Sequence, residues 1–323
     1  MAAMQLPKGL IVDLITPFSK DGGIDGKGLE RHLKALMPHV QAIFLAGPYM
    51  GEGAGLSPEQ REELFHKTLL IVQSRLPVLV WISRATDGET EDTLLLLKKR
   101  IDELRYPGPV FWVDTPLYYH SNRGLEGHYK KISSLVEEHF IIINDPVMVR
   151  EKDQPLKRVN IRTSILKRLA SIESLEGLIF WGSLDRSYNY RKAVRSRIDF
   201  MIYDGDESHF LEHPSLNGVL SRGANLAPAA WKTITASSLN LNGNLEDYPD
   251  RMRQILDAGK YLNDLRNIYR GYGPVFLKQV LSKIGIIEYP ASSIDSEKIA
   301  GDVKSVVELM ERHRNYSPFK TQP

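Results

Sequence analysis

The sequence contains no cysteine. The chain therefore forms no disulfide, has no thiolate-ligated zinc site and has no cysteine nucleophile. It also lacks a marked excess of charge of either sign, because 42 basic residues are balanced by 40 acidic ones and the formal net charge is +2. These charges are spread along the chain, whereas nucleic-acid binding requires a clustered basic face. We expect no nucleic-acid partner.

Long hydrophobic runs are missing as well. Residues 1–18 carry one lysine and a short apolar run that Asp13 interrupts, which fits neither a signal peptide nor a membrane span. We therefore expect a cytoplasmic protein with no membrane partner. With 323 residues, of which 42% are hydrophobic and 25% charged, the chain is long enough for a full core.

Short apolar runs rich in β-branched residues alternate with amphipathic segments, a pattern that indicates strand–helix units in a parallel sheet. The eight runs are residues 9–15, 42–47, 77–83, 109–114, 140–145, 177–182, 199–204 and 217–221. Most are continuously hydrophobic, as expected for strands that are buried on both faces. Eight such units predict an α/β fold of the (β/α)8 TIM-barrel type, in which functional residues lie at the carboxyl ends of the strands.

Helix signals support this division. Ser57 is suited to cap a helix that has Pro58 at its first position, and Gln60 completes a capping box. After about residue 240 the alternation stops, and three helical segments follow without strands. We predict a barrel over residues 1–240 and a C-terminal helical appendage over residues 241–323 that packs on it, with a frayed end.

The predicted end of the second strand is a glycine-rich turn. Gly51, Gly53 and Gly55 permit a tight backbone that holds Glu52, either because the geometry requires it or because the loop contacts a ligand. The third strand ends at Arg84, which suits an anionic ligand or an ion pair at the surface.

The fourth and fifth strands also end in polar residues. Tyr118 and Tyr119 suit a proton relay or an interface, and the adjacent His120 suits a partly solvated loop better than a catalytic base. Asn144 and Asp145 follow the fifth strand, where Asp145 is either a base or a turn former before proline.

The late strand ends leave two further alternatives. Ser221 and Asn225 lie on a turn before a helix N-terminus that suits an anion, although Asn225 is more simply an N-cap. His209 and His213, four residues apart, suit a divalent ion, but a solvated helix face explains them better. We expect no metal and no cofactor.

Together and in this order, these strand ends resemble the dihydrodipicolinate synthase and N-acetylneuraminate lyase family of pyruvate-dependent aldolases. The resemblance covers about residues 8–285. Its motifs are "LITPFSKDGGIDGKGLERHL", "GEGAGLSPEQREEL", "TPLYY", "NDP", "GLI", "NGVLSRGANLAP" and "PVFLKQVLSKIG". The resemblance implies a barrel that acts on keto acids or sugar acids, and a homodimer or homotetramer.

The positions that would carry the family's chemistry differ in this chain. The resemblance places the lysine that forms a Schiff base with pyruvate at Ile179, in the run "EGLIFWGSLD". It places the proton-relaying tyrosine at Ile143, and the threonine pair that binds the carboxylate at Tyr49 and Met50. At these positions the polar residues of the family are mostly replaced by apolar ones that would share one cavity. Such replacement indicates that the chemistry has been lost, because an unneeded buried polar group costs free energy if it is unpaired.

Three hypotheses follow, and the sequence leaves open whether the protein is an enzyme. In the first, the barrel is a non-catalytic or repurposed homologue that has lost the Schiff base and binds a small carboxylate or sugar acid. Its pocket candidates are Tyr49, Met50, Glu52, Arg84, Tyr118, Tyr119, Asn144, Asp145, Trp181, Ser221 and Asn225. In the second, an active lyase or synthase uses a lysine elsewhere, or acid–base chemistry through Asp145, Glu52 and Tyr119. A regulatory subunit of an active paralogue would have the same sequence features as the first.

Overall fold

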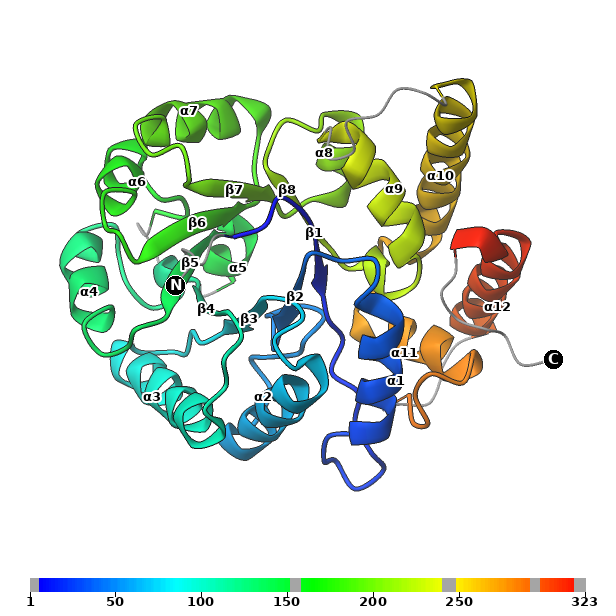
Figure 1. Cartoon of the computed structure of the whole chain (residues 1–323), viewed down its shortest axis with the longest axis horizontal. Coiled ribbons are helices and arrows are strands. Elements are labelled where there is room, and N and C mark those ends of the chain that lie inside the picture. Colours follow the sequence, from blue (N-terminus) through cyan, green and yellow to red (C-terminus); the bar gives the residue numbers. More distant parts are fainter. Residues whose placement is uncertain (1–5, 152–157, 240–247, 291–296, 317–323) are drawn as a thin grey trace. The chain divides into compact units, whose positions relative to one another are not determined.

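The computed structural model describes residues 6–151, 158–239, 248–290 and 297–316. The strands follow one another in chain order around a closed barrel, which confirms the predicted α/β class and the (β/α)8 TIM-barrel fold (Figure 1). They are β1 (Gly9–Asp13), β2 (Ala42–Leu45), β3 (Val78–Trp81), β4 (Val110–Asp114), β5 (His139–Asn144), β6 (Leu175–Phe180), β7 (Met201–Asp204) and β8 (Gly218–Ser221). Each strand coincides with one apolar run of the sequence, to within about two residues at either end.

The chain divides into two compact units. One comprises residues 1–8 and 77–220, and the other comprises residues 9–76 and 221–323. The second unit is therefore built from two segments that are distant in sequence.

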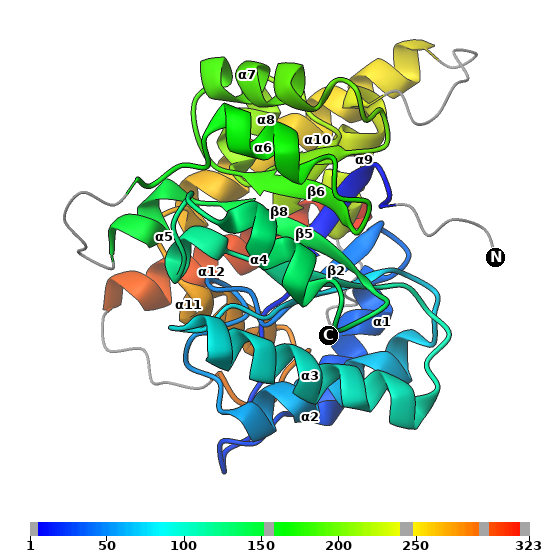
Figure 2. The ribbon, with the colours of Figure 1, turned by 90° about the vertical axis from the view of Figure 1, so that its left-hand side faces the viewer.

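The unit of residues 77–220 carries β3 to β7 and most of β8, with the helices between them. These are α3 (Asp87–Leu104), η1 (Pro116–Tyr118), α4 (Leu125–Ile132), α5 (Pro146–Arg150), α6 (Thr163–Leu169), α7 (Leu184–Val194) and α8 (Glu207–Glu212). In Figure 2, α4 and α6 lie in front of β5 and β6, and cover this part of the sheet. The register of β5 against β6 shifts between Phe140 and Ile141, which pair with Leu175 and Gly177, so the pairing passes over Glu176. Glu176 lies inside β6, although the apolar run of the sequence had placed it before the strand.

The other unit holds β1 and β2 together with the helices of both its segments. These are α1 (Gly26–Leu36), α2 (Pro58–Val72), η2 (Gly223–Asn225), α9 (Pro228–Ser238), α10 (Tyr248–Tyr269), α11 (Pro274–Lys283), α12 (Glu297–Arg312) and η3 (Arg314–Tyr316). Ser57, Pro58 and Gln60 form the predicted start of α2, with both hydrogen bonds of the capping box present. The boundary expected at residue 240 stays a prediction, and residues 317–323 lie outside the described part.

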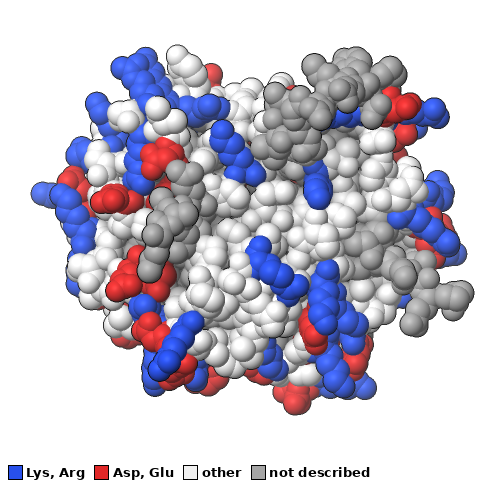
Figure 3. Space-filling model, viewed as in Figure 1, with Lys and Arg blue, Asp and Glu red and all other residues white. Residues whose placement is uncertain are grey.

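The described surface mixes both signs of charge. On the face seen in Figure 3, basic and acidic side chains lie interspersed, as the near-zero net charge suggests. Among the described residues, no helix combines the length and the apolarity that crossing a membrane requires.

Candidate functional site

Two buried isoleucines stand side by side at the carboxyl ends of β5 and β6. Ile143 is the cross-strand partner of Ile179, and the two residues are 1% and 0% exposed. Because paired residues project to the same face of a sheet, these side chains are neighbours. The positions that the resemblance assigns to a relay hydroxyl and a nucleophilic amine therefore hold adjacent aliphatic groups.

The same face continues to Tyr203 on β7, which pairs with Ile179. The Tyr203 hydroxyl donates a hydrogen bond to the Pro7 carbonyl at 2.6 Å. Burial raises the pKa of Tyr203 far above its usual value, so the hydroxyl keeps its proton. Tyr203 was not among the candidates predicted from the sequence. It is a polar group near the isoleucine pair, but its hydroxyl hydrogen is already donated to Pro7.

Asn144 and Asp145 have structural roles. The Asn144 amide donates to the Asn160 side chain at 3.0 Å, and its oxygen accepts from the Ile161 amide and the Tyr190 hydroxyl. The Asp145 carboxylate accepts from the amides of Val147 and Met148, and so caps α5. Asp145 is the turn former that the sequence allowed.

A buried carboxylate at the end of β4 gathers three hydroxyl groups. Asp114 is fully buried and accepts hydrogen bonds from Ser83 at 2.6 Å, Tyr129 at 2.7 Å and Tyr119 at 2.9 Å. Asp114 pairs with Ile142, so it projects to the face opposite Ile143. Tyr119 therefore belongs to a network on the helix side of the sheet.

This network continues to the histidine of α4. The Tyr119 oxygen lies 3.0 Å from His128 Nε2, and His128 Nδ1 lies 3.3 Å from an oxygen of Asp87. His120 packs against His128, with ring centroids 5.2 Å apart. Burial lowers the pKa of His128, partly offset by the carboxylates of Asp114 and Asp87. Burial also raises the pKa of Tyr119 well above its usual value.

The other candidates of this unit pack locally. Arg84 Nε reaches the Thr93 hydroxyl at 3.4 Å, and Tyr118 lies edge-on to Trp81. Trp181 packs over Gly205 so closely that a Cβ there would lie 2.2 Å from its ring.

His209 forms a pair that the sequence did not predict. Its Nδ1 contacts the Asp204 carboxylate at the end of β7, and burial raises the pKa of Asp204 against the opposing effect of that contact. Asp204 pairs with Phe180, so it projects to the face opposite Ile179. The sequence predicted that both histidines lie on a solvated helix face. His213 is exposed, as this predicts, whereas His209 is half-buried.

In the other unit, the turn after β2 is tightly built. A Cβ on Gly51 would lie 2.3 Å from the Gly47 nitrogen, so only glycine fits at this approach. Within the turn, Tyr49 is half-buried, Met50 is 3% exposed and Glu52 has a positive φ of 52°.

Glu52 is held by a buried lysine. Its carboxylate accepts a hydrogen bond from Lys278 of α11, whose side chain is 0% exposed. The same ammonium lies 4.3 Å from the centre of the Phe18 ring. Burial lowers the pKa of Lys278, and Glu52 opposes this shift. Among the described residues, Lys278 is the single buried lysine.

Ser221 and Asn225 are also satisfied internally. The Ser221 hydroxyl accepts the Ala224 amide at 2.9 Å. The Asn225 amide donates to the carbonyls of Asp13 and Arg222, and its oxygen accepts from His32 at 3.0 Å. Asn225 ends η2 and does not cap α9, whose N-cap is Ala227. The N-cap interpretation of Asn225 was therefore wrong.

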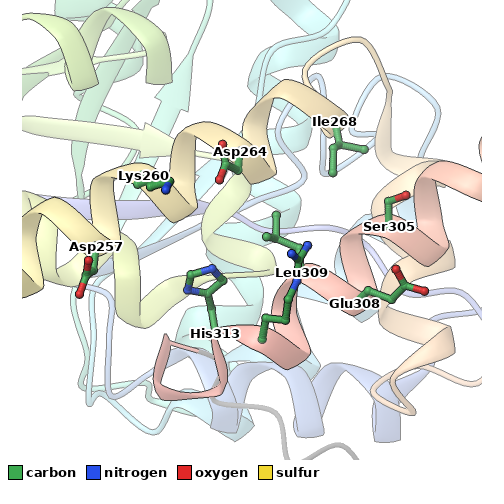
Figure 4. A pocket seen from close by; sticks show the side chains of 9 residues that line it. Asp257, Lys260, Asp264, Ile268, Ser305, Glu308, Leu309 and His313 are labelled. Carbon is green, nitrogen blue, oxygen red and sulfur yellow. The ribbon is translucent and has the colours of Figure 1, made fainter.

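A cavity of about 430 Å³ opens between α10 and α12 (Figure 4). Its charged lining residues are Asp257, Lys260, Asp264, Glu308 and Arg312, and His313 also lines it. Since both signs of charge line it, this cavity indicates no particular ligand.

Within each unit, the polar sequence candidates are mostly held by hydrogen bonds to their own surroundings. Sequence reasoning missed Asp114, His128 and Lys278. His128 had a signal, because it stands between Leu125 and Tyr129 on the apolar face of α4, where a polar residue needs a partner.

Comparison with known proteins agrees with this fold. Residues 6–290 match the model of the dihydrodipicolinate synthetase family. The 4-hydroxy-tetrahydrodipicolinate synthase of Thermotoga neapolitana is 30% identical over 285 residues, which are 87% of this chain and 90% of that protein. The synthase of Archaeoglobus fulgidus is 28% identical over 318 residues, 94% of this chain and 98% of that protein.

Solved structures give the same picture. Dihydrodipicolinate synthase from Thermotoga maritima superimposes with a TM-score of 0.73 at 23% identity, over 94% of this chain and 98% of that chain. A monomeric dihydrodipicolinate synthase variant gives a TM-score of 0.76 at 23% identity, over 94% of this chain and 97% of that chain. At these identities the superposition supports the fold alone.

Proposed function

Because the chain belongs to the dihydrodipicolinate synthetase family, we propose that it is a barrel of that family that forms no Schiff base with pyruvate. It binds a small carboxylate or sugar acid without this chemistry. The curated relatives are synthases of 4-hydroxy-tetrahydrodipicolinate, whose name denotes a dicarboxylate. Small carboxylates are therefore the first ligands to test.

The observation that carries this proposal is the neighbouring pair of Ile143 and Ile179. A Schiff base requires a neutral primary amine, and a proton relay requires a hydroxyl. Aliphatic side chains supply neither group. The two residues are cross-strand partners, so both assigned positions lie at one place on the sheet.

The acid–base alternative is weakened by what its three residues already do. Asp145 caps α5, Glu52 pairs with Lys278, and Tyr119 donates to Asp114. Each group would have to break the contact that it already makes before it could serve as a base or an acid.

A displaced lysine remains a second candidate, favoured by one observation. Lys278 is buried, and burial lowers its pKa, as a Schiff-base amine requires. Its contact with Glu52 favours the protonated form, which cannot attack a carbonyl group. We therefore rank this route below loss of the reaction.

Borohydride trapping tests the proposal. The protein is incubated with pyruvate and then with other 2-keto acids and sugar acids, reduced, and measured by intact mass. We expect no adduct, while a family member that has the strand-six lysine gives one. An adduct that maps to Lys278 would replace the proposal with the displaced-lysine mechanism.

The variant I179K restores a lysine at the position that the family resemblance assigns to the nucleophile, and it should gain the ability to form the pyruvate adduct. If Ile179 occupies the nucleophile position, the introduced amine is desolvated by its surroundings and forms a reducible adduct with pyruvate. The control is L178K, because Leu178 precedes Ile179 in β6 and projects to the opposite face of the strand. An adduct on L178K but not on I179K would contradict the assigned register.

We further propose a cytoplasmic homodimer or homotetramer, with residues 241–323 as an appendage on the barrel. Sedimentation velocity tests the assembly, and a monomer at all concentrations would argue against it. Stable expression of residues 1–240 alone would argue against an appendage that packs on the barrel.

A further inference from the structure

Three side chains with metal-binding atoms meet beside the end of β4. Asp87 is the first residue of α3, His120 lies in the loop after η1, and His128 lies on α4. One ligand atom from each lies within 4.8 Å of the other two. All three belong to the unit of residues 77–220. They lie around the Asp114 network, on the helix side of the sheet.

The hydrogen bonds of this network determine the tautomer of His128. The Tyr119 hydroxyl has one hydrogen, which it donates to Asp114, because an ionised carboxylate can only accept. The contact between the Tyr119 oxygen and His128 Nε2 then requires the hydrogen on that nitrogen. A neutral His128 therefore carries its lone pair on Nδ1.

This lone pair faces another acceptor. His128 Nδ1 lies 3.3 Å from the Asp87 carboxylate, and a lone pair opposite a carboxylate repels it. Only a second proton on the imidazole or a cation between the two groups makes this contact favourable.

The separation of the two atoms suits a metal. Zinc bonds to nitrogen and oxygen of about 2.0–2.1 Å give a regular tetrahedron an edge of about 3.4 Å. The measured 3.3 Å between His128 Nδ1 and Asp87 matches this edge. His120 Nδ1 is engaged with Ser121, which leaves Nε2 as the ligand atom of that ring. The ligand atom of His120 lies within 4.8 Å of the other two, against a tetrahedral edge of about 3.4 Å.

We propose that Asp87, His120 and His128 bind one divalent transition-metal ion, with Zn²⁺ as the best match. Two imidazoles and one carboxylate are borderline ligands that favour Zn²⁺ over Mg²⁺ or Ca²⁺. Three protein ligands leave a fourth position for water or a carboxylate ligand. Tyr119 and Asp114 are positioning residues, since they hold His128 through its other nitrogen. This proposal is independent of the one concerning the Schiff base.

Metal binding to the full chain tests the proposal. The protein is stripped with chelator and titrated with Zn²⁺ in competition with a chromophoric indicator, and Co²⁺ is added separately to record its visible spectrum. We expect one Zn²⁺ per chain and the intense absorption of tetrahedral Co²⁺. D87N and H120A should each weaken Zn²⁺ binding at least ~10-fold and reduce the Co²⁺ absorption.

Two control variants distinguish binding at this site from binding by other exposed carboxylates and histidines. Asp92 lies exposed on the same helix as Asp87, and His213 is an exposed histidine elsewhere, so D92N and H213A should bind Zn²⁺ as the wild type does. D87N and H120A alter side chains that are exposed or half-buried, so folding should survive, and far-UV circular dichroism checks this. Absence of stoichiometric binding, or binding that D87N and H120A leave unchanged, would overturn the proposal. His128 and Asp87 would then form a simple ion pair.

Discussion

The buried histidine of α1 predicts a specific loss of stability in acid. His32 is 0% exposed, and its Nε2 lies 3.0 Å from the Asn225 side-chain oxygen. The Asn225 amide nitrogen donates to two carbonyls, so this oxygen is the acceptor and His32 Nε2 carries the hydrogen. Burial lowers the pKa of His32 from 6.5 to about 4, and the contact with Asn225 offsets only part of this.

The sign of the effect follows from proton binding. Between pH 6.5 and about 4, His32 binds a proton in the unfolded chain but not in the folded protein. The free energy of unfolding therefore falls as the pH falls through this window, and the contribution is complete only above pH 6.5. The gap between the two pKa values corresponds to roughly 3 kcal/mol in total, of which about 2 kcal/mol is lost by pH 5.

The variant H32Q isolates this contribution, because glutamine places an amide nitrogen near the position of Nε2 and does not titrate. Urea denaturation of wild type and H32Q at pH 7.5, 6.0, 5.0 and 4.5, followed by circular dichroism, gives the two pH dependences. H32Q should lose about 2 kcal/mol less than the wild type between pH 7.5 and 5.0. H213Q, at an exposed histidine, should behave as the wild type. Parallel pH dependences of H32Q and wild type would refute the argument.

The contacts of Lys278 and Asp145 each predict an effect on stability. K278M should lower the free energy of unfolding by about 1–3 kcal/mol, because it leaves the partly exposed Glu52 carboxylate without its cation, and the double variant E52Q/K278M should recover part of this loss in urea denaturation. Equal destabilisation of the single and double variants would contradict a direct ion pair. D145A should cost about 1 kcal/mol of stability through loss of the cap of α5, and should leave the affinity for any bound carboxylate unchanged in calorimetry. A loss of affinity without a loss of stability would instead make Asp145 a ligand-binding residue.

Local patterns made the strands predictable from the sequence. Each strand of the barrel contains a run of mostly apolar residues, and burial on both faces requires this composition whatever the neighbouring strand is. The start of α2 was predictable for a similar reason, because Ser57 and Gln60 act within one helical turn.

The roles of the polar candidates depended on partners that no local pattern reveals. Glu52 and Lys278 are 226 positions apart, and Asn225 contacts Ile15 over 210 positions. Glu176 lies where the register shifts, which the sequence does not mark. The pairing of Ile143 with Ile179 likewise required the register of two strands that are separated by α5 and α6.

The unit of residues 9–76 and 221–323 can be completed only after its second segment has been synthesised. Its N-terminal segment leaves the ribosome before residues 77–220, which form the other unit. At a translation rate of about 5–20 residues per second, Glu52 emerges roughly 10 to 45 s before its partner Lys278. During that interval the first two strands expose apolar surface that their own segment cannot cover. A nascent chain that pauses in this interval is the form of this protein most in need of a chaperone.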